Sequence, residues 1–449
     1  MVHILLVVFV LVFHIAIGNG STCPSREWIE QSLEKIHVPG AAIIVVNATH
    51  VLYEQAVGYK SLSPKEPIDI DKSIFTLGSI SKTFIGIAVM QLVEQELVDL
   101  DTDINQYLSE PQRRIFHPHY PLHSITLRKL LSHSASISIN RQEEDTFFKP
   151  GDEAFNESLA DVCFKYVNPN TSNWLPKPPG SVSLYSNQGS SLAALVVERI
   201  ANMRYSDYVE EKILKPIGID ITKTGVRLSD FENINDLVTS YAYAPNVDYF
   251  EKYYHAMSQL NITKISDNFP TWLQISPFSL SGYPAGLWRM SARALSVYLR
   301  MFLNNGSSIL HPRSIAEIRT AVGCGVIPMF TPEPVNNNTI QRRLEYGLSW
   351  YWVTTDKGDR YFGHAGELPG MAHVMLTNKK NIGVIILSNA DTNAPINLTQ
   401  QIWKTYEDIY VSFFQCLDTD PVRASAFRTK GTLFGLFISI ILLFRTVIA

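Results

Sequence analysis

Four short apolar segments, separated by turns rich in Asp, Gly, Lys and Asn, occupy the C-terminal part of the sequence. This spacing predicts an antiparallel meander. The segments cover residues 347–354, 360–364, 371–377 and 382–387. Two more strands are expected at residues 41–46 and 51–59, on either side of a polar turn. The simplest closure joins the hairpin and the meander into one sheet with helices on its faces.

Helical periodicity marks the segments on either side of these strands. Residues 27–38 are expected to form a helix that ends at Pro39-Gly40. Ser291 is a suitable N-cap for a later helix that ends near Gly306. The fold class predicted is therefore α/β (α+β), with helices flanking an antiparallel sheet and a mainly helical lobe.

The middle of the chain has a different texture. Residues 100–108 and 126–132 have helical patterns, whereas residues 138–180 and 231–277 are rich in Asn, Pro, Asp and aromatic residues. We interpret the two latter stretches as long loops or insertions, which often form a pocket wall, or alternatively as solvated insertions.

These patterns predict one domain over residues 21–420. Its sheet part is expected at about residues 21–95 and 281–415, and its helical lobe with insertions at about residues 96–280. We find no internal repeat.

Both ends of the chain are apolar. Residues 1–20 are typical of a secretory signal peptide, with an uncleaved anchor as the alternative. Residues 421–449 contain an apolar run that predicts either a marginal membrane helix or the signal for a lipid anchor; a core or surface helix is a further alternative. Either membrane reading implies attachment through the C-terminal segment.

Seven Asn-x-Ser/Thr sequences favour a glycosylated protein of the secretory pathway, located outside the cell or at its surface. They begin at Asn47, Asn156, Asn170, Asn261, Asn305, Asn337 and Asn397.

Composition excludes other classes. With 46% hydrophobic and 18% charged residues the chain is globular, and a net charge of -4 without a sustained basic run argues against nucleic-acid binding. Four cysteines, Cys23, Cys163, Cys324 and Cys416, are interpreted as structural, but their pairing is open. No metal-ligand spacing is present, so we expect no metal and no cofactor.

The candidate nucleophile is Ser79, followed three residues later by Lys82. Within one helical turn the two side chains can meet. Gly78 suits a chain entering a helix, whose unpaired N–H groups stabilise negative charge on oxygen. A partly desolvated Lys82 loses its proton more readily and helps to activate the hydroxyl. An ordinary N-cap serine with a solvated lysine is the alternative.

Two later segments supply the other groups that a serine nucleophile needs. Tyr185 and Asn187 are expected on one side of an extended or turning segment. A nearby lysine would lower the pKa of the Tyr185 phenol so that it acts as a base, and the Asn187 carboxamide would bind a substrate amide. His364 ends a predicted strand. The small Gly366 would let a substrate lie against the backbone, and the Glu367 N–H could donate to an oxyanion.

Ser-x-x-Lys, Tyr-x-Asn and His-x-Gly, in this order, resemble the motifs of the serine β-lactamase and penicillin-binding protein superfamily. Tyr185 points to the branch of class C β-lactamases, D-Ala-D-Ala carboxypeptidases and related esterases. The resemblance extends over about residues 25–412, through flanking segments such as Asp99-Leu100-Asp101, residues 125–134 and Pro284-Ala285-Gly286-Leu287.

The resemblance implies a β-lactamase/transpeptidase-like fold and a role for each motif residue. Ser79 would be acylated, Lys82 would be its proton partner, and Tyr185 would be the general base and acid. Asn187 would bind the substrate. The backbone N–H groups of Ser79 and Glu367 would form the oxyanion hole.

His364 stands where β-lactamases usually carry a lysine that attracts a substrate carboxylate. We therefore expect an esterase or peptidase acting on a small molecule or peptide with an ester or amide bond. The alternatives are a catalytically weak binding or matrix protein and a true β-lactamase. His133, Tyr346 and Trp350 are interpreted as packing residues.

Overall fold

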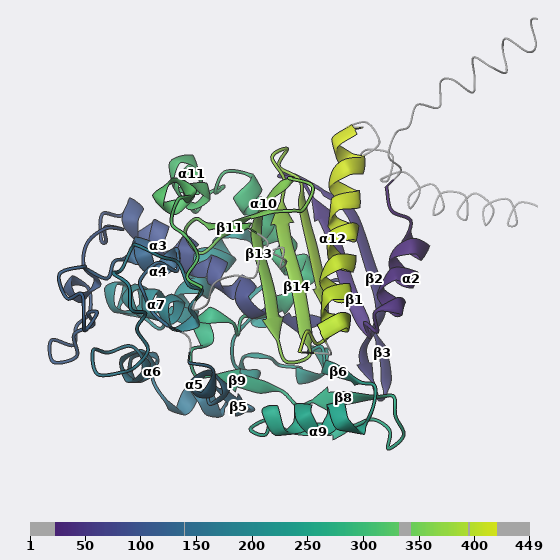
Figure 1. Ribbon diagram of the computed structural model, residues 1–449. Coiled ribbons are helices and arrows are strands. Elements are labelled where there is room, and N and C mark those ends of the chain that lie inside the picture. The colour runs from purple at the N-terminus through teal and green to yellow at the C-terminus, as the bar shows by residue number, and fades with distance from the viewer. Residues whose placement is uncertain (1–22, 139, 332–342, 394–395, 420–449) are drawn as a thin grey trace, which may run out of the picture.

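A single eight-stranded antiparallel sheet forms the centre of the computed structural model (Figure 1). The structure describes residues 23–138, 140–331, 343–393 and 396–419. The strand order is β11-β12-β13-β14-β15-β1-β2-β3. In chain order the strands are β1 (Gly40–Val46), β2 (Val51–Leu62), β3 (Lys65–Pro67), β11 (Arg343–Tyr346), β12 (Tyr351–Thr354), β13 (Arg360–Leu368), β14 (Met371–Thr377) and β15 (Gly383–Ser388). The last strand, β15, pairs with the first, β1, so the predicted closure is confirmed.

Alternate residues of the central strands face two separate cores. Ile44 of β1 packs with α3 (Lys82–Glu94) and α10 (Ala292–Leu303) on one face. Ile43 packs with α2 (Arg26–Lys35) and α12 (Ile396–Thr419) on the other. Because both faces are covered, β1, β14 and β15 are buried along their whole length. Ser291 caps α10 as predicted, accepting a hydrogen bond from the Ala294 N–H.

The disulfide Cys23–Cys416 joins the segment before α2 to α12, with a Cα–Cα distance of 5.0 Å. Cys163 is buried and Cys324 is exposed, and both are free thiols. The structural interpretation of the cysteines is thus confirmed for this pair. The sequence had left the pairing open.

A mainly helical lobe lies beside the sheet, with α3 between the two (Figure 1). Every residue of α3 from Lys82 to Leu92 is buried, and α3 contacts α7 of the lobe. The helices of the lobe are α4 (Leu127–Leu131), α5 (Arg141–Asp145), α6 (Leu159–Tyr166), α7 (Asn187–Ala201) and α8 (Tyr205–Tyr208), and α11 (Pro312–Arg319) also contacts α3.

The helix expected at residues 100–108 is wrong, since only a short 3-10 turn forms at Ile104–Gln106. Side-chain oxygens of Asp99 and Asp103 accept hydrogen bonds from the N–H groups two residues later, at 2.8 Å in both cases. Such local bonds compete with helix formation.

The two stretches expected as long loops contain more regular structure than predicted. Small antiparallel pairs and one further helix form in and around them. These elements are β5 (Phe148–Pro150), β6 (Ser240–Ala244), α9 (Val247–Ala256), β7 (Ile262–Lys264), β8 (Thr271–Ile275) and β9 (Phe278–Leu280). The Tyr-rich segment forms β6 and α9, and β6 pairs with β8 about thirty residues away. A local sequence pattern cannot reveal that β8 is the partner of β6.

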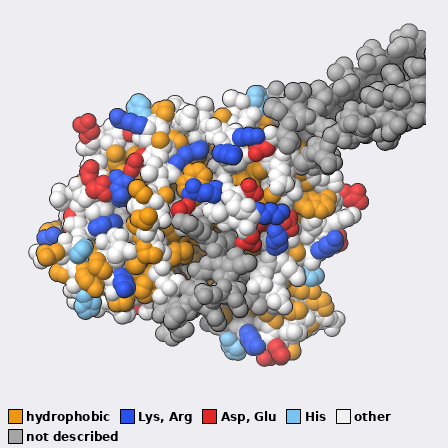
Figure 2. All heavy atoms as spheres, turned by 45° about the horizontal axis from the view of Figure 1, so that its top comes forward, with side chains coloured by type: hydrophobic (Ala, Val, Ile, Leu, Met, Phe, Trp, Pro, Cys, Tyr) orange, Lys and Arg blue, Asp and Glu red, His pale blue; other side chains and the backbone are white. Residues whose placement is uncertain are grey.

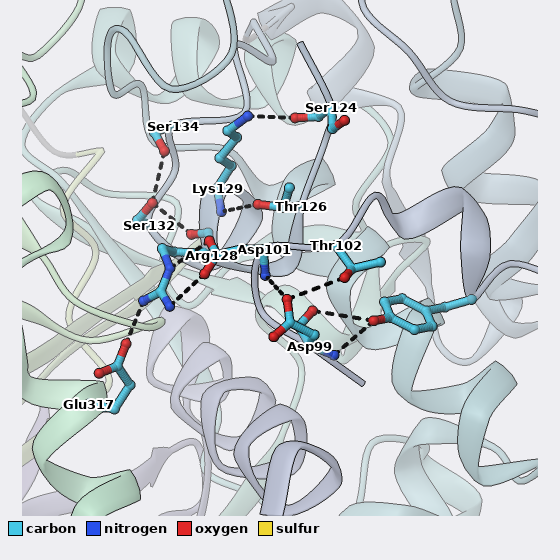
Figure 3. Close-up of polar contacts among 11 residues, drawn as sticks. Asp99, Asp101, Thr102, Ser124, Thr126, Arg128, Lys129, Ser132, Ser134 and Glu317 are labelled. Carbon is cyan, nitrogen blue, oxygen red and sulfur yellow. Dashed lines mark hydrogen bonds and ion pairs between the residues drawn. The ribbon is translucent and has the colours of Figure 1, made fainter. Parts of the chain in front are cut away.

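Arg128 of α4 ties the lobe together (Figure 3). Its Nε and Nη2 donate to both carboxylate oxygens of Asp101 at 2.8 and 2.9 Å, and its Nη1 donates to Glu317 of α11. The Arg128 guanidinium lowers the pKa of the Asp101 carboxyl. Bidentate pairs of this kind fix geometry as well as adding stability. They hold the segment that leads to His133.

The predicted signal peptide and C-terminal apolar segment lie outside the described residues. Within the described ranges, no helix combines the length and apolar character needed to cross a bilayer. On the face seen in Figure 2, side chains of both charges are interspersed, and no extended area of one sign is visible.

Candidate active site

Ser79 sits in a 3-10 turn, Gly78–Ser81, that leads directly into α3. The turn is fixed from behind, because the Leu77 N–H donates to the Trp288 carbonyl at 2.7 Å. Gly78 has a φ of +56°, and a Cβ there would lie 2.8 Å from the Glu367 nitrogen. A glycine is therefore required for the turn to approach β13.

Lys82 is fully buried directly beneath the serine. Its Nζ donates to Ser79 Oγ at 3.0 Å and to the Ala285 carbonyl at 2.5 Å. Burial lowers the pKa of Lys82 to about 7, and the charge of Glu144 acts in the opposite direction. The structure thus brings Ser79 and Lys82 together as predicted, with the amine able to exist in its neutral form near pH 7.

Tyr185 completes the group around the nucleophile. The Lys82 Nζ lies 4.8 Å from the centroid of its ring. The Tyr185 hydroxyl is buried and interacts with the Ser79 hydroxyl, although the pair does not meet strict hydrogen-bond geometry. Burial raises the pKa of Tyr185 well above 10, while the neighbouring Ser79 hydroxyl acts to lower it. The expected lowering of this pKa by a lysine is therefore wrong, because loss of hydration dominates.

His133 supports Tyr185 from behind, as a packing residue. Its Nδ1 accepts a hydrogen bond from the Ser186 N–H at 3.2 Å, and its ring centroid lies 4.5 Å from that of Tyr185. Burial lowers the pKa of His133 well below 6.5, so the ring is neutral. Tyr346 packs on His133 and Trp350 is buried, in agreement with the interpretation of all three as packing residues.

His364 lies in β13 and is almost fully buried. Its ring centroid lies 4.8 Å from that of Tyr351 and 6.2 Å from that of Tyr185. Burial, reinforced by the charge of Lys82, lowers the pKa of His364 to about 3. The third motif therefore carries no fixed positive charge at neutral pH.

Gly366 has a different role from the one expected. A Cβ at this position would lie 2.2 Å from the Leu77 carbonyl oxygen. The glycine lets β13 approach the backbone just before the nucleophile, and Gly366 does not line the cavity described below. Its absence of a side chain serves packing between two backbone segments, not contact with a substrate.

A cavity of about 290 Å³ opens in front of Ser79. Asn187, the first residue of α7, and Glu367 line it as predicted, whereas Lys82, Tyr185 and His364 are not among its lining residues. The other lining residues come mainly from the middle of the chain and are Glu144, Asp145, Phe147, Phe148, Met257, Leu280, Gly282, Ala285, Gly286, Leu368, Pro369, Thr392 and Asn393.

Sequence reasoning missed two acidic residues near this cavity. Glu144 lies in the stretch read as a loop, where nothing distinguishes it from neighbouring acids. Asp391 is buried, and its carboxylate accepts hydrogen bonds from the Gly370 N–H at 2.7 Å and from the Tyr253 hydroxyl. Burial raises the pKa of Asp391 to about 6. It anchors the turn between β13 and β14, next to Glu367.

No group of three or more metal-ligating side chains gathers anywhere in the described ranges. A hydroxyl, a buried amine and a phenol converge beside backbone N–H groups, as nucleophilic catalysis on a carbonyl requires.

The motif order and this antiparallel sheet with its helical lobe define the class of serine β-lactamases and transpeptidases. Within that class, the chain belongs to the Beta-lactamase family, whose model matches residues 26–404. The predicted fold class and the family resemblance are both confirmed.

Individual relatives are distant. The chain is 22% identical over 387 residues to penicillin-binding protein 4* of Bacillus subtilis (strain 168). The aligned region covers 84% of this chain and 74% of that protein. A D-amino acid amidase from Ochrobactrum anthropi SV3, complexed with L-phenylalanine amide, superposes with a TM-score of 0.63 at 16% identity, over 86% and 97% of the two chains. The octameric penicillin-binding protein homologue from Pyrococcus abyssi has a TM-score of 0.63 at 20% identity, over 83% and 74%. At such identities these structures show the shared fold.

Proposed function

We propose that this chain is a serine hydrolase that cleaves an ester or amide bond through an acyl-enzyme on Ser79. The observation that carries the proposal is the buried Lys82 amine, 3.0 Å from Ser79 Oγ, with a pKa of about 7. A neutral amine at this distance can accept the hydroxyl proton as the serine attacks.

The proposed reaction has two halves. Ser79 Oγ attacks the carbonyl carbon while its proton passes to Lys82, and the N–H groups of Ser79 and Glu367 stabilise the oxyanion. The tetrahedral intermediate then collapses, and the leaving alcohol or amine receives the proton held by Lys82, either directly or through the Tyr185 hydroxyl, which donates its own proton and takes that of Lys82 in return. In the second half, a water molecule attacks the acyl carbon and gives a proton to Lys82. Lys82 then returns this proton to Ser79 Oγ as the ester bond to the serine breaks.

In this scheme Tyr185 works as a neutral phenol. Because burial keeps its pKa well above 10, its hydroxyl can donate to the leaving group, whereas Lys82 is the base. Asn187 would contact the substrate from the cavity wall. This assigns the base role that the resemblance implied for Tyr185 to the lysine.

Two alternatives are weaker. A β-lactamase needs a cation for the substrate carboxylate, and a neutral His364 does not supply one. The neutral His364 also fits a binding protein with little turnover. A binding role, however, does not explain why the buried Lys82 amine lies next to the Ser79 hydroxyl.

Reaction with a fluorophosphonate probe tests the proposal. We expect one stoichiometric adduct, located on Ser79 by mass spectrometry of the folded protein, and no adduct on the Ser79→Ala variant. Absence of any adduct on Ser79 across several probes of different size would contradict a hydrolase. Labelling without hydrolysis of any ester or amide in a broad panel would favour the binding protein.

We further propose that the protein is secreted or held at the cell surface. Support comes from the disulfide Cys23–Cys416, since such bonds persist in oxidising compartments, and from exposed asparagines in five of the predicted glycosylation sequences. These are Asn156, Asn170, Asn261, Asn305 and Asn397. Attachment through residues 421–449 stays a prediction. A protein from eukaryotic cells that shows no mobility shift after N-glycan removal would count against this location.

A further inference from the structure

A second cavity, of about 260 Å³, shares no lining residue with the cavity in front of Ser79. Its wall includes residues of β2, β4 (Ile74–Thr76), β6 and β8 and the first residue of β14. Most of its lining side chains are polar, and those that carry a hydroxyl are Ser61, Ser63, Thr76, Thr239, Ser240 and Ser276. A cavity with several convergent polar groups is suited to a specific polar ligand.

The charged side chains of this second cavity leave one positive charge in excess. Lys60 forms an ion pair with Glu66, with Nζ 2.9 Å from Oε2. Among the described residues that line the cavity, the other charged one is Arg289 of β10 (Arg289–Ser291), which is only 2% exposed. The cavity therefore favours a negatively charged ligand over a positively charged one.

The guanidinium of Arg289 forms no ion pair with a carboxylate of the described residues. Its Nη1 donates to the Val226 carbonyl and its Nη2 donates to the Phe278 carbonyl at 2.6 Å. Burial lowers the pKa of Arg289 to about 10, and the charges of Asp152 and Asp230 act in the opposite direction without direct contact. The group stays charged at neutral pH, whereas buried charges are usually paired. Because a guanidinium has five N–H donors, some remain for a ligand.

Two buried hydroxyl groups at the second cavity have no hydrogen-bond partner among the residues that the structure describes. They belong to Thr76, which is 7% exposed, and Ser240, which is 5% exposed. The Thr76 carbonyl accepts from His373 Nε2 at 2.8 Å, and the Ser240 backbone pairs with β8, so these residues make their polar contacts through the main chain. Buried polar groups are nearly always hydrogen-bonded. A ligand that accepts from both hydroxyls would satisfy them.

Strand pairing places the cation and a hydroxyl on the same side. Arg289 lies directly opposite Thr76 in the antiparallel pair of β10 and β4. Side chains of directly opposite residues lie on one face of the pair and are neighbours. Phe278, whose carbonyl binds the Arg289 guanidinium, also lines the cavity, which places the charged group at the wall.

We propose that the second cavity binds a small oxyanion, a phosphate or a small carboxylate, through the Arg289 guanidinium and the hydroxyls of Thr76 and Ser240. Arginine recognises both kinds of oxyanion with its N–H donors, and hydroxyl groups donate to the same oxygens. The volume of about 260 Å³ lies just below the usual range for drug-sized ligands, so the ligand is small. This site does not depend on hydrolysis at Ser79.

The proposed anion site is connected to the nucleophile through β4. Thr76 is followed by Leu77, whose N–H donates to the Trp288 carbonyl at 2.7 Å, and then by the turn that carries Ser79. An anion held between Arg289 and Thr76 would fix β4 against β10 and so stabilise the entry to this turn. Hydrogen exchange of β4 and β6 should slow when the anion binds, whereas that of α2 on the far face of the sheet should not change.

Isothermal titration calorimetry of the full-length protein tests the site. The titrants are inorganic phosphate and acetate, added separately in Tris-chloride buffer, with sodium chloride at matched ionic strength as the reference. At least one of the two oxyanions should bind saturably to a single site per chain and give the expected protection of β4 and β6. The titrant that binds more tightly identifies the class of ligand.

Two variants remove different parts of the site. Arg289→Gln removes the charge, and the double variant Thr76→Val/Ser240→Ala removes the two hydroxyls but keeps the guanidinium. Each should weaken binding by about 10- to 100-fold, as expected for loss of hydrogen bonds to a charged group. Arg289 also holds two backbone carbonyls, so the double variant decides the question if Arg289→Gln does not fold.

The matched control is Arg293→Gln. Arg293 belongs to α10, where its guanidinium pairs with Glu54 at 2.6 Å and Asp71 at 2.7 Å, and it does not line the second cavity. This variant removes the same charge from a neighbouring position, so it should bind the anion as the wild-type protein does.

Three results would overturn the anion site. The first is the absence of saturable binding of both phosphate and acetate to the folded wild-type protein. The second is binding that Arg289→Gln and the double variant both retain, because the anion then lies elsewhere. The third is an equal loss in Arg293→Gln, which would indicate general charge attraction. Labelling of Ser79 is measured separately, so none of these results affects the proposed hydrolase.

Discussion

Replacing Lys82 with methionine should slow acylation of Ser79 by about 10³-fold or more, because the serine loses the group that accepts its proton. Methionine has a similar length and fits an apolar site, so the fold should survive. The rate constant of labelling by a fluorophosphonate, or of hydrolysis of any ester found in a screen, measures the effect. Ser79→Ala gives the background rate of each assay.

The pH dependence of the acylation rate of the wild-type protein provides a second test of Lys82 as the base. Only neutral Lys82 can act as a base, and its pKa is about 7. The acylation rate should therefore rise with pH through about 7 and level off above it. The Lys82→Met variant should show no such limb. A wild-type rate that does not change between pH 6 and 8.5 would contradict Lys82 as the base.

Stability should respond to Lys82 in the opposite direction from activity. The pKa of Lys82 in the folded protein, about 7, lies below its usual value of 10.5. The unfolded chain therefore binds more protons between these values, and this residue makes the free energy of unfolding rise with pH over that window. Lys82→Met should unfold at the same or higher denaturant concentration at pH 7, which separates loss of catalysis from loss of the fold. A large drop in the unfolding midpoint would show that the lysine is needed for folding.

Removing the disulfide should have the largest effect on stability. The bond joins two residues that are 393 positions apart in sequence and therefore restricts the unfolded chain. Loss of such a bond typically lowers the free energy of unfolding by about 2–5 kcal/mol. The Cys23→Ser/Cys416→Ser double variant should unfold at correspondingly lower denaturant concentration. Equilibrium unfolding in urea measures this difference.

The exposed free thiol offers a control. Cys324→Ser should change the free energy of unfolding by no more than about 0.5 kcal/mol, as surface substitutions usually do. The disulfide lies with the core on the far side of the sheet from α3, so Ser79 of the folded double variant should still label at the wild-type rate. Coincident unfolding curves for the double variant and the wild-type protein would contradict a stabilising bond.

Features with a local signal were predictable from the sequence. The strands β1 and β15 follow from short apolar runs bounded by turn residues. Ser79 and Lys82 follow from spacing, because three residues of helix bring them to one face. The pairing of the hairpin with the meander was predicted as the simplest way to join both into one sheet with helices on its faces.

Features that depend on distant partners were not predictable. Part of the Tyr-rich segment forms β6 only because β8 pairs with it. The pKa of Tyr185 is raised by burial, which no local sequence pattern reveals. Gly366 was assigned to substrate contact, although its neighbour is the Leu77 carbonyl from a remote segment. Glu144 gains meaning only where its helix meets the start of α7.

The pairing of β15 with β1 also decides when the protein can fold. During synthesis the turn that carries Ser79 leaves the ribosome early, but the strand that faces it, β13, follows almost three hundred residues later. Throughout this interval the edge of β1 in the β1–β2 hairpin lacks its partner β15. This open edge can pair with a wrong strand. Contacts of such long range slow the search for the native state, so nascent chains should depend on chaperones until β13, β14 and β15 have left the ribosome.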